Sequence, residues 1–252
     1  MAGNIAHGAA YLGRGARMLR HPSLRLFVIV PLLVNILIFA TLLTVGFSYV
    51  TDLMAWLDAS LPQWLDFLRW ILWPLIILTA LLLSGYLFTF VAVLIASPFN
   101  GLLAEKAEEL ITGRPVDALE GLRAALVMVP RGIVREILKL LYYAPIALGV
   151  FLLSLVPGIN AVAPLLWFLL GAWMMSIQFV DYPMDNHQHS FADVKVAVRT
   201  RRLSSLGFGG LVALCAGIPV LNFFVMPAAV VGATLFWCEE LSPDFQPPAG
   251  GY

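Results

Sequence analysis

A short polar motif stands at the start of the first long apolar stretch, and its residue types are those that bind anions. Pro22 suits the first position of a helix, and Ser23 and Arg25 follow it closely. The first amides of a helix have no partner within the helix, so they and the helix dipole attract negative charge. The Arg25 guanidinium adds a fork that matches a tetrahedral oxyanion. The motif therefore predicts either an oxyanion site or a basic anchor at the membrane boundary.

Two rows of charge farther along the chain have helical spacing. Glu105 and Glu109 lie four residues apart, as do Arg131, Arg135 and Lys139 in succession. Side chains at this spacing share one face of a helix, and rows of like charge repel unless they are countered. We therefore expect the acidic and basic rows to face one another. They would form either a solvated ion-pair face or a polar vestibule.

The densest polar cluster contains Asp181, Asp185, His187 and His189. These residue types bind divalent metals or serve hydrolases. Their spacing matches no ligand pattern, however, and Pro183 argues against one continuous helical face. No nucleophile elbow, zinc-protease motif or phosphate loop is visible. We therefore predict a structured polar connector, with no catalytic residue, no metal site and no cofactor.

The elements that must position these side chains are apolar to an extent found in integral membrane proteins. The chain is 61% hydrophobic and 12% charged, and its net charge of zero gives no reason to expect nucleic acid. Four stretches hold no charged residue: 26–51, 70–104, 140–180 and 203–238. The first two stretches are each long enough for one membrane span.

The charges flanking these spans predict a topology. Four arginines precede the first span, whereas the loop after it holds three aspartates against one arginine. By the positive-inside rule the N-terminus is then cytoplasmic. One helical face before the first span is apolar, which predicts either an interfacial helix or a helix packed on the protein itself. Its residues are Ile5, Ala9, Leu12, Ala16 and Leu19.

The last two uncharged stretches are each interrupted by Pro-x-x-Asn, at Pro157 and Asn160 and again at Pro219 and Asn222. Proline ends a helix and asparagine suits a turn or N-cap, so each stretch predicts a helical hairpin with this motif at its tip. First arms of about 15 to 17 apolar residues rise roughly 22 to 26 Å, short of a core of about 30 Å. We predict re-entrant hairpins, with ordinary pairs of short spans as the alternative.

The predicted fold is an all-α integral membrane protein with one membrane-embedded domain. It comprises an interfacial helix (1–25), two long transmembrane helices (26–50 and 70–96), amphipathic cytoplasmic helices (97–139), a first re-entrant hairpin (140–180), a polar connector (181–202), a second re-entrant hairpin (203–238) and a polar tail (239–252).

Several motifs, in the same order, resemble the CysZ family of bacterial inner-membrane sulfate transporters. They are residues 22–25 leading into 30–35, residues 98–105, residues 181–187, Phe208-Gly209, and Pro219-x-x-Asn222 followed by 226–230 and 232–234. The resemblance implies sulfate uptake for cysteine biosynthesis, hemi-penetrating hairpins in a multi-pass inner-membrane protein, and a homo-oligomer that can contain antiparallel subunits. The weak charge bias would permit such dual topology.

The family's sulfate site is a loop of the type Gly-hydrophobic-Arg-Arg ahead of the first span. The resemblance places this site at Ser23, Leu24 and Arg25. Arg25 is kept, whereas Ser23 stands for the glycine and Leu26 for the second arginine. We expect the pathway or vestibule to be lined by Asn35, Asn100, Glu105, Glu109, Arg131 and Arg135.

We therefore expect a channel-like sulfate permease that does not hydrolyse ATP, with sulfite as a competing anion and the lipid bilayer as its surroundings. The alternatives are a proton-coupled sulfate transporter, a membrane scaffold that transports nothing, and, third, a membrane enzyme using the polar cluster. Sulfate carries two charges, so entry against an inside-negative potential of 100 mV costs about 4.6 kcal/mol. A gradient, consumption of sulfate or a coupled ion must supply this energy.

Overall fold

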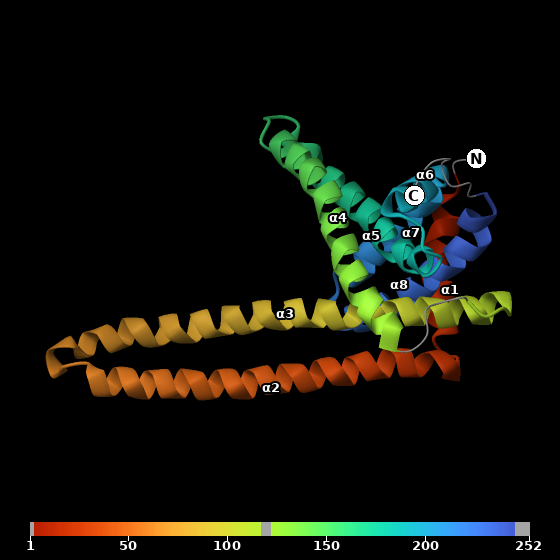
Figure 1. Ribbon diagram of the computed structural model, residues 1–252. Coiled ribbons are helices and arrows are strands. Elements are labelled where there is room, and N and C mark those ends of the chain that lie inside the picture. The colour runs from red at the N-terminus through yellow and green to blue at the C-terminus, as the bar shows by residue number, and fades with distance from the viewer. Residues whose placement is uncertain (1–2, 117–121, 245–252) are drawn as a thin grey trace. The chain divides into compact units, whose positions relative to one another are not determined.

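The computed structural model describes residues 3–116 and 122–244, and helices dominate both ranges (Figure 1). The long helices are α1 (Ile5–Met18), α2 (Pro22–Ser60), α3 (Asp66–Thr112), α4 (Leu122–Ser154), α5 (Ala163–Asn186), α6 (Phe191–Thr200), α7 (Arg202–Ala216) and α8 (Pro219–Phe236). Short 3-10 helices occur at η1 (Gln63–Leu65), η2 (Asn160–Val162) and η4 (Ser242–Asp244), and a π-helical turn, η3, covers Trp237–Leu241.

The chain forms two compact units. Residues 29–96 make the first, which we call the apolar hairpin, and the flanking residues make the second, which we call the body. Five helical segments of the described residues are long and apolar enough to cross a membrane, namely Pro22–Ser60, Asp66–Phe88, Pro130–Ser154, Asn160–Asn186 and Leu221–Leu241. The protein is therefore a multi-pass membrane protein, as the composition predicts.

The apolar hairpin consists of most of α2 and the first part of α3, which run antiparallel and are joined by a turn around η1 (Figure 1). The Phe39 and Phe88 rings meet edge to face with centroids 4.9 Å apart. No described side chain between residues 29 and 88 is buried. A helix that is apolar on all sides and leaves its side chains this exposed requires lipid or another apolar partner around it.

The body is held by close helix packing. Helix α1 lies against α7 and α8, and α5 also lies against both of them. Glycine permits this approach, because a Cβ on Gly15 would stand 2.3 Å from the Ala228 carbonyl oxygen and one on Gly209 would stand 1.9 Å from the Ala172 carbonyl oxygen. The fully buried side chains of Tyr11, Phe208 and Phe236 fill the space between these helices, among others.

Helix α1 begins at the N-cap Asn4, whose side-chain oxygen accepts a hydrogen bond of 2.8 Å from the Ala6 amide. Its buried residues are Gly8, Tyr11, Leu12 and Gly15. This is packing on the protein's own body, the second of the two interpretations of this helix. The buried face is displaced from the one predicted by the spacing: Leu12 is common to both, and Gly8, Tyr11 and Gly15 take the place of the other predicted residues.

The predicted turn motifs separate helices in both hairpins. Pro157 lies in the turn between α4 and α5, where Gly158 adopts a φ of 89°, and Asn160 starts η2. Pro219 is the first residue of α8, and its side chain lies outside the described residues. Asn222 does not cap α8: Ile218 is the N-cap, and the Asn222 amide donates to the Ile218 carbonyl at 2.9 Å.

The arm lengths differ between the two hairpins. Helix α4 continues well beyond its uncharged run because the charged segment from Arg131 to Lys139 is helical too, so both α4 and α5 reach the length of a span. Helix α7 has 15 residues and rises about 22 Å, which is shorter than the hydrocarbon core. The argument from short arms therefore applies to the second hairpin and not to the helices of the first.

Candidate functional site

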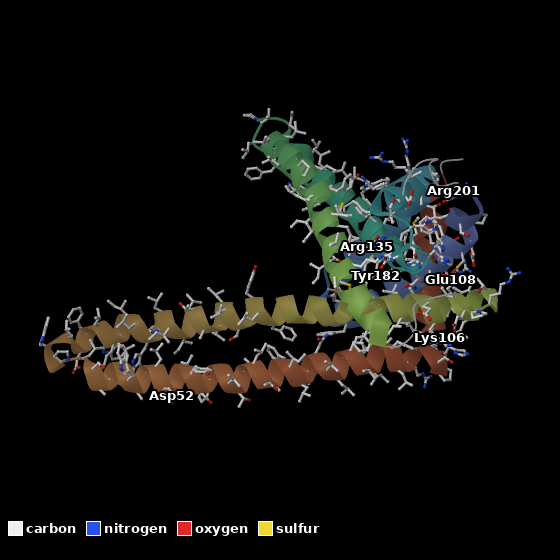
Figure 2. All side chains as sticks on the ribbon, in the orientation of Figure 1. Asp52, Lys106, Glu108, Arg135, Tyr182 and Arg201 are labelled. Atoms are coloured by element: carbon white, nitrogen blue, oxygen red, sulfur yellow. The ribbon has the colours of Figure 1, made fainter. Side chains whose placement is uncertain are left out.

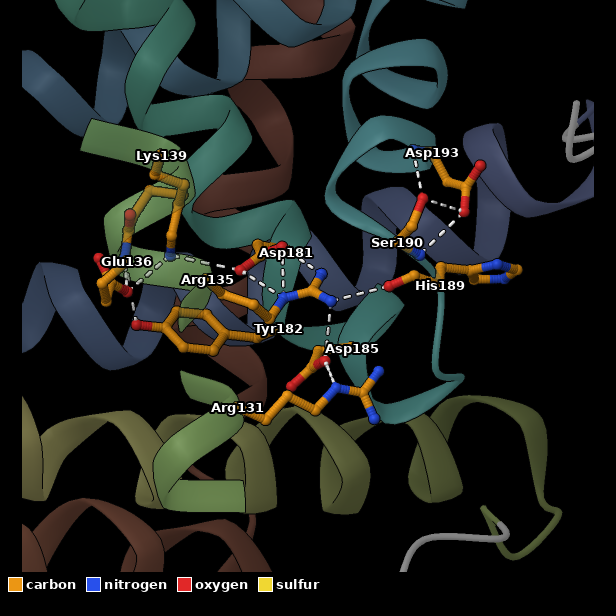
Figure 3. A network of polar contacts seen from close by, with 11 residues as sticks. Arg131, Arg135, Glu136, Lys139, Asp181, Tyr182, Asp185, His189, Ser190 and Asp193 are labelled. Atoms are coloured by element: carbon orange, nitrogen blue, oxygen red, sulfur yellow. Dashed lines mark hydrogen bonds and ion pairs between the residues drawn. The ribbon is translucent and has the colours of Figure 1, made fainter. Parts of the chain in front are cut away.

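The charged row on α4 meets acidic side chains of α5 (Figure 3). Arg135 Nε lies 3.1 Å from Asp181 Oδ1, and Arg135 Nη1 lies 2.9 Å from Asp185 Oδ1. Arg131 Nε reaches the same Asp185 oxygen at 2.8 Å, and Lys139 Nζ lies 3.3 Å from Asp181 Oδ2. The predicted pairing of this basic row with Glu105 and Glu109 is wrong, because the row faces α5.

Three of these charges are deeply buried, and all of them are paired. The exposed fractions of Arg135, Lys139 and Asp181 are 6%, 4% and 3%. Lys139 also lies 2.6 Å from Glu136 Oε1, and Arg135 donates to the His189 carbonyl at 2.7 Å. A buried charge is costly unless it is paired and hydrogen-bonded. The cluster therefore holds α4 against α5, and its basic and acidic groups neutralise one another.

Helix α5 brings Asp181 and Asp185 together because it does not stop at Pro183, contrary to the prediction from the sequence. Pro183 lies in the last turn, where the loss of one backbone hydrogen bond disturbs few residues. The two aspartates, four residues apart, therefore share a helical face toward α4. The segment read as a loop is the end of a helix as far as Asn186.

The second part of α3 joins this end of α5. Glu108 Oε1 lies 2.7 Å from His187 Nε2, and the Glu108 side chain is buried, with no hydrogen-bond partner for Oε2 among the described residues. Asn100 Nδ2 donates to the Tyr182 hydroxyl at 3.2 Å, and Asn186 Nδ2 donates to the Gly101 carbonyl at 3.0 Å. Figure 2 shows Glu108, Tyr182 and Arg135 in this part of the body.

The pKa values of the two histidines in the cluster are shifted in opposite directions. The hydrogen bond to Glu108 raises the pKa of His187 above its ordinary value, against the opposing effect of burial. Burial lowers the pKa of His189. The His187–Glu108 contact therefore favours the charged imidazolium, whereas the surroundings of His189 favour the neutral ring.

The predicted oxyanion motif forms the first turn of α2. The Leu24 side chain is fully buried in the core of the body, and the Leu24 amide donates to the His21 carbonyl at 3.1 Å. The Ser23 amide lies 3.4 Å from His21 Nδ1. Arg25 is exposed and has no ion-pair or hydrogen-bond partner among the described residues. Leu24 anchors the turn to the core of the body, while the Arg25 side chain stays exposed.

The remaining predicted residues fall in different places. Asn35 belongs to the apolar hairpin and Asn222 to the body, and each has a buried side-chain oxygen without a hydrogen-bond partner among the described residues. Glu109 pairs with Lys106 on its own helix, and Glu105 is half-buried on α3. Pro157 is exposed in its turn.

Two of the polar contacts that the sequence did not predict join distant elements. One is Glu108 with His187, whose separation along the chain gives no periodic signal. The other joins α1 to η3, where Arg14 Nη1 lies 2.6 Å from Glu239 Oε2, and burial is the main cause of a raised pKa at Tyr11 beside it. No group of metal-ligating side chains is found over residues 3–116 and 122–244.

Comparison with known proteins gives consistent matches along the chain. The family model described as "Sulfate transporter CysZ/Etoposide-induced protein 2.4" matches residues 11–227. A sulfate transporter CysZ of Pseudomonas paraeruginosa is 45% identical over 236 residues, covering 92% of this chain and 95% of the relative. The CysZ of Pseudomonas fluorescens is 43% identical, and the match covers 95% of this chain and 96% of that relative. The CysZ of Vibrio atlanticus is 45% identical, and the match covers 92% of each chain.

These matches span both units and include the turn that holds Arg25, the α4–α5 cluster and most of the second hairpin. The predicted resemblance is confirmed, and with it the expectation of a transporter rather than an enzyme. The chain belongs to the CysZ family of sulfate transporters.

Proposed function

We propose that this protein is a sulfate permease of the bacterial inner membrane, which admits sulfate to the cytoplasm for cysteine biosynthesis without hydrolysing ATP. The name shared by its relatives, sulfate transporter CysZ, supports this substrate. The five segments of spanning length support a path across the bilayer.

Arg25 carries the proposal for the first binding step. An anion binds best to a cation whose charge is not already neutralised by a carboxylate. The cations of the α4–α5 cluster are all paired with Asp181, Asp185 or Glu136, whereas Arg25 has no such partner among the described residues. Sulfate would therefore bind at the first turn of α2, with help from the Ser23 hydroxyl and the helix dipole.

The route beyond Arg25 is proposed to follow polar groups at the depth of the membrane. The unpartnered side-chain oxygen of Asn222 marks such a group in the body, since a buried amide without a partner is costly in an apolar setting, and the apolar hairpin holds a group of the same kind at Asn35. The charge-balanced cluster around Arg135 would then form a wall or gate. In this scheme the short arm α7 makes the second hairpin re-entrant, and antiparallel copies of the chain complete the pathway.

Coupling to protons is a second candidate, and the His187–Glu108 contact favours it. Glu108 is buried, and its hydrogen bond raises the pKa of His187 above the ordinary value, so His187 could take up and release the proton in such a mechanism. One proton entering with each sulfate would offset half of the charge carried inward. An inward proton gradient would then accelerate uptake, which a simple channel would not show.

Flux of labelled sulfate into liposomes that contain the purified protein tests the proposal. We expect Arg25→Ala to weaken uptake about tenfold or more, since a hydrogen bond to a charged group contributes about 1.5–3 kcal/mol. Arg199→Ala, which removes an exposed arginine of α6, is the matched control and should transport normally. Equal flux in the two variants would remove Arg25 from the site, and no flux in the wild type would favour the scaffold alternative.

A further inference from the structure

A groove of about 770 Å³ lies on the apolar hairpin beside its turn. Its lining residues come mainly from α3, with one from α2: Asp58, Asp66, Arg69, Trp70, Trp73, Pro74, Ile77, Leu78 and Leu81. The volume lies in the range of sites for small amphipathic molecules. Neither the anion motif nor the α4–α5 cluster contributes to it.

The lining changes from charged to apolar along the helix. Asp58, Asp66 and Arg69 form the end nearest the turn, the two tryptophans come next, and aliphatic side chains as far as Leu81 form the other end. From Arg69 to Leu81 the helix rises about 18 Å, close to half of a hydrocarbon core of about 30 Å. Tryptophan is typical of the level of lipid headgroups. The groove therefore has the length and polarity of one phospholipid in one leaflet.

The charged end of the groove holds one arginine and two aspartates. Arg69 Nε lies 3.2 Å from Asp58 Oδ1, Arg69 Nη1 lies 3.3 Å from Asp66 Oδ1, and Arg69 Nη2 donates to the Asp58 carbonyl at 3.0 Å. Each of the three guanidinium nitrogens thus has an oxygen of Asp58 or Asp66 within 3.3 Å. Two carboxylates against one guanidinium leave one negative charge, which repels an anionic lipid and attracts a cation. Both aspartate side chains remain accessible, with exposed fractions of 41% and 56%.

We propose that this groove binds one phosphoglyceride with a primary ammonium headgroup, of the phosphatidylethanolamine class. The ammonium donates to Asp58 and Asp66, which a quaternary ammonium cannot do because it has no N–H. The aromatic faces of Trp70 and Trp73 add a surface favourable to a cation. One acyl chain lies along Ile77, Leu78 and Leu81, whose exposed fractions of 45%, 55% and 60% leave apolar surface for lipid to cover.

Native mass spectrometry of the full-length protein in detergent tests the proposal, with added phosphatidylethanolamine, phosphatidylcholine and phosphatidylglycerol compared at equal concentration. The wild type should retain one phosphatidylethanolamine roughly tenfold better than either of the others, the effect of about 1.4 kcal/mol. Leu78→Trp fills the groove and should abolish this retention. Leu82→Trp makes the same change at an exposed position outside the groove and should retain the lipid. Asp66→Asn should remove the preference over phosphatidylcholine.

Other outcomes would overturn the proposal. Equal retention of all three lipids by the wild type, or a preference for phosphatidylglycerol, would contradict the headgroup argument. Phosphatidylethanolamine binding that survives in Leu78→Trp would place the lipid elsewhere. A change of oligomer mass in Leu78→Trp, with lipid retention unaltered, would show that a second copy of the chain occupies the groove.

Discussion

The apolar hairpin (29–96) and the body differ in whether their apolar side chains are buried against other parts of the protein. Along the apolar hairpin no described side chain up to residue 88 is buried, whereas α8 alone contributes an unbroken run of buried residues from Ala228 to Phe236. The body also places Arg135, Lys139 and Asp181 in its interior, whereas the hairpin's Arg69 stays near its surface, with an exposed fraction of 31%. The body is thus stabilised by its own contacts, and the hairpin depends on what surrounds it.

The largest difference should come from the two arginine clusters. Arg135→Ala leaves Asp181 buried without its main partner, and breaking a buried pair in this way costs about 3–5 kcal/mol. Arg69→Ala removes exposed pairs that contribute about 1 kcal/mol or less. Chemical unfolding in detergent measures both. Equal losses would contradict the distinction between the two regions.

Overpacking within the body should lower stability nearly as much as breaking the buried ion pair. Gly15→Ala places a methyl group against the backbone of α8, and overpacking of this kind costs about 1–3 kcal/mol. Gly13 lies on the same helix and has open space around it, so Gly13→Ala should be neutral or gain up to about 1 kcal/mol in helix propensity. Thermal unfolding of the two variants compares them directly. We expect Gly15→Ala to lower the unfolding temperature and Gly13→Ala to leave it unchanged or raise it. A lowering in both variants, or in neither, would show that α1 does not pack closely against α8 at Gly15.

The body should also respond to pH through His187. Its pKa is raised in the folded protein by Glu108, so the stabilisation is fully present below the unfolded value of about 6.5 and disappears as pH rises through the folded pKa. His189, with its lowered pKa, destabilises the fold at acid pH instead. The unfolding temperature of the wild type minus that of His187→Gln should therefore shrink between pH 6 and pH 9. A constant difference would mean that the histidine is not charged in the fold.

The smallest effect should be in the apolar hairpin itself. Phe47 has an exposed fraction of 71%, so Phe47→Ala removes a contact with detergent or lipid rather than with protein. We expect a change within about 0.5 kcal/mol, as for most surface substitutions. Phe208→Ala in the body core, by comparison, should cost about 3–5 kcal/mol. A large loss at Phe47 would reveal a second copy of the chain packed there.

The sequence predicts the features that local chemistry determines. Long uncharged runs indicate spans, Pro157 and Pro219 fall at helix boundaries, and the spacing of Arg131, Arg135 and Lys139 correctly puts them on one face. The comparisons confirm the family, and the helical membrane class is confirmed as well.

The partners across helices were not predictable in the same way. Spacing states which face of α4 is charged, but only the three-dimensional packing decides whether that face meets α3 or α5. Proline at position 183 suggested a break because a proline near a helix end and one in a loop look alike in sequence. The close approach of α1 at Gly8 and Gly15 was missed because glycines carry no apolar signal in the sequence.

The packing of α1 against both α7 and α8 has a consequence for biosynthesis. A ribosome releases the first helix long before it makes the last one. While the intervening segments enter the bilayer, α1 therefore lacks the surfaces of α7 and α8 against which it packs. The early amphipathic segment must wait on the membrane surface, or with a chaperone, until the end of translation. A nascent chain arrested before Pro219 should consequently leave its N-terminal segment open to protease, and one extended through Leu241 should protect it.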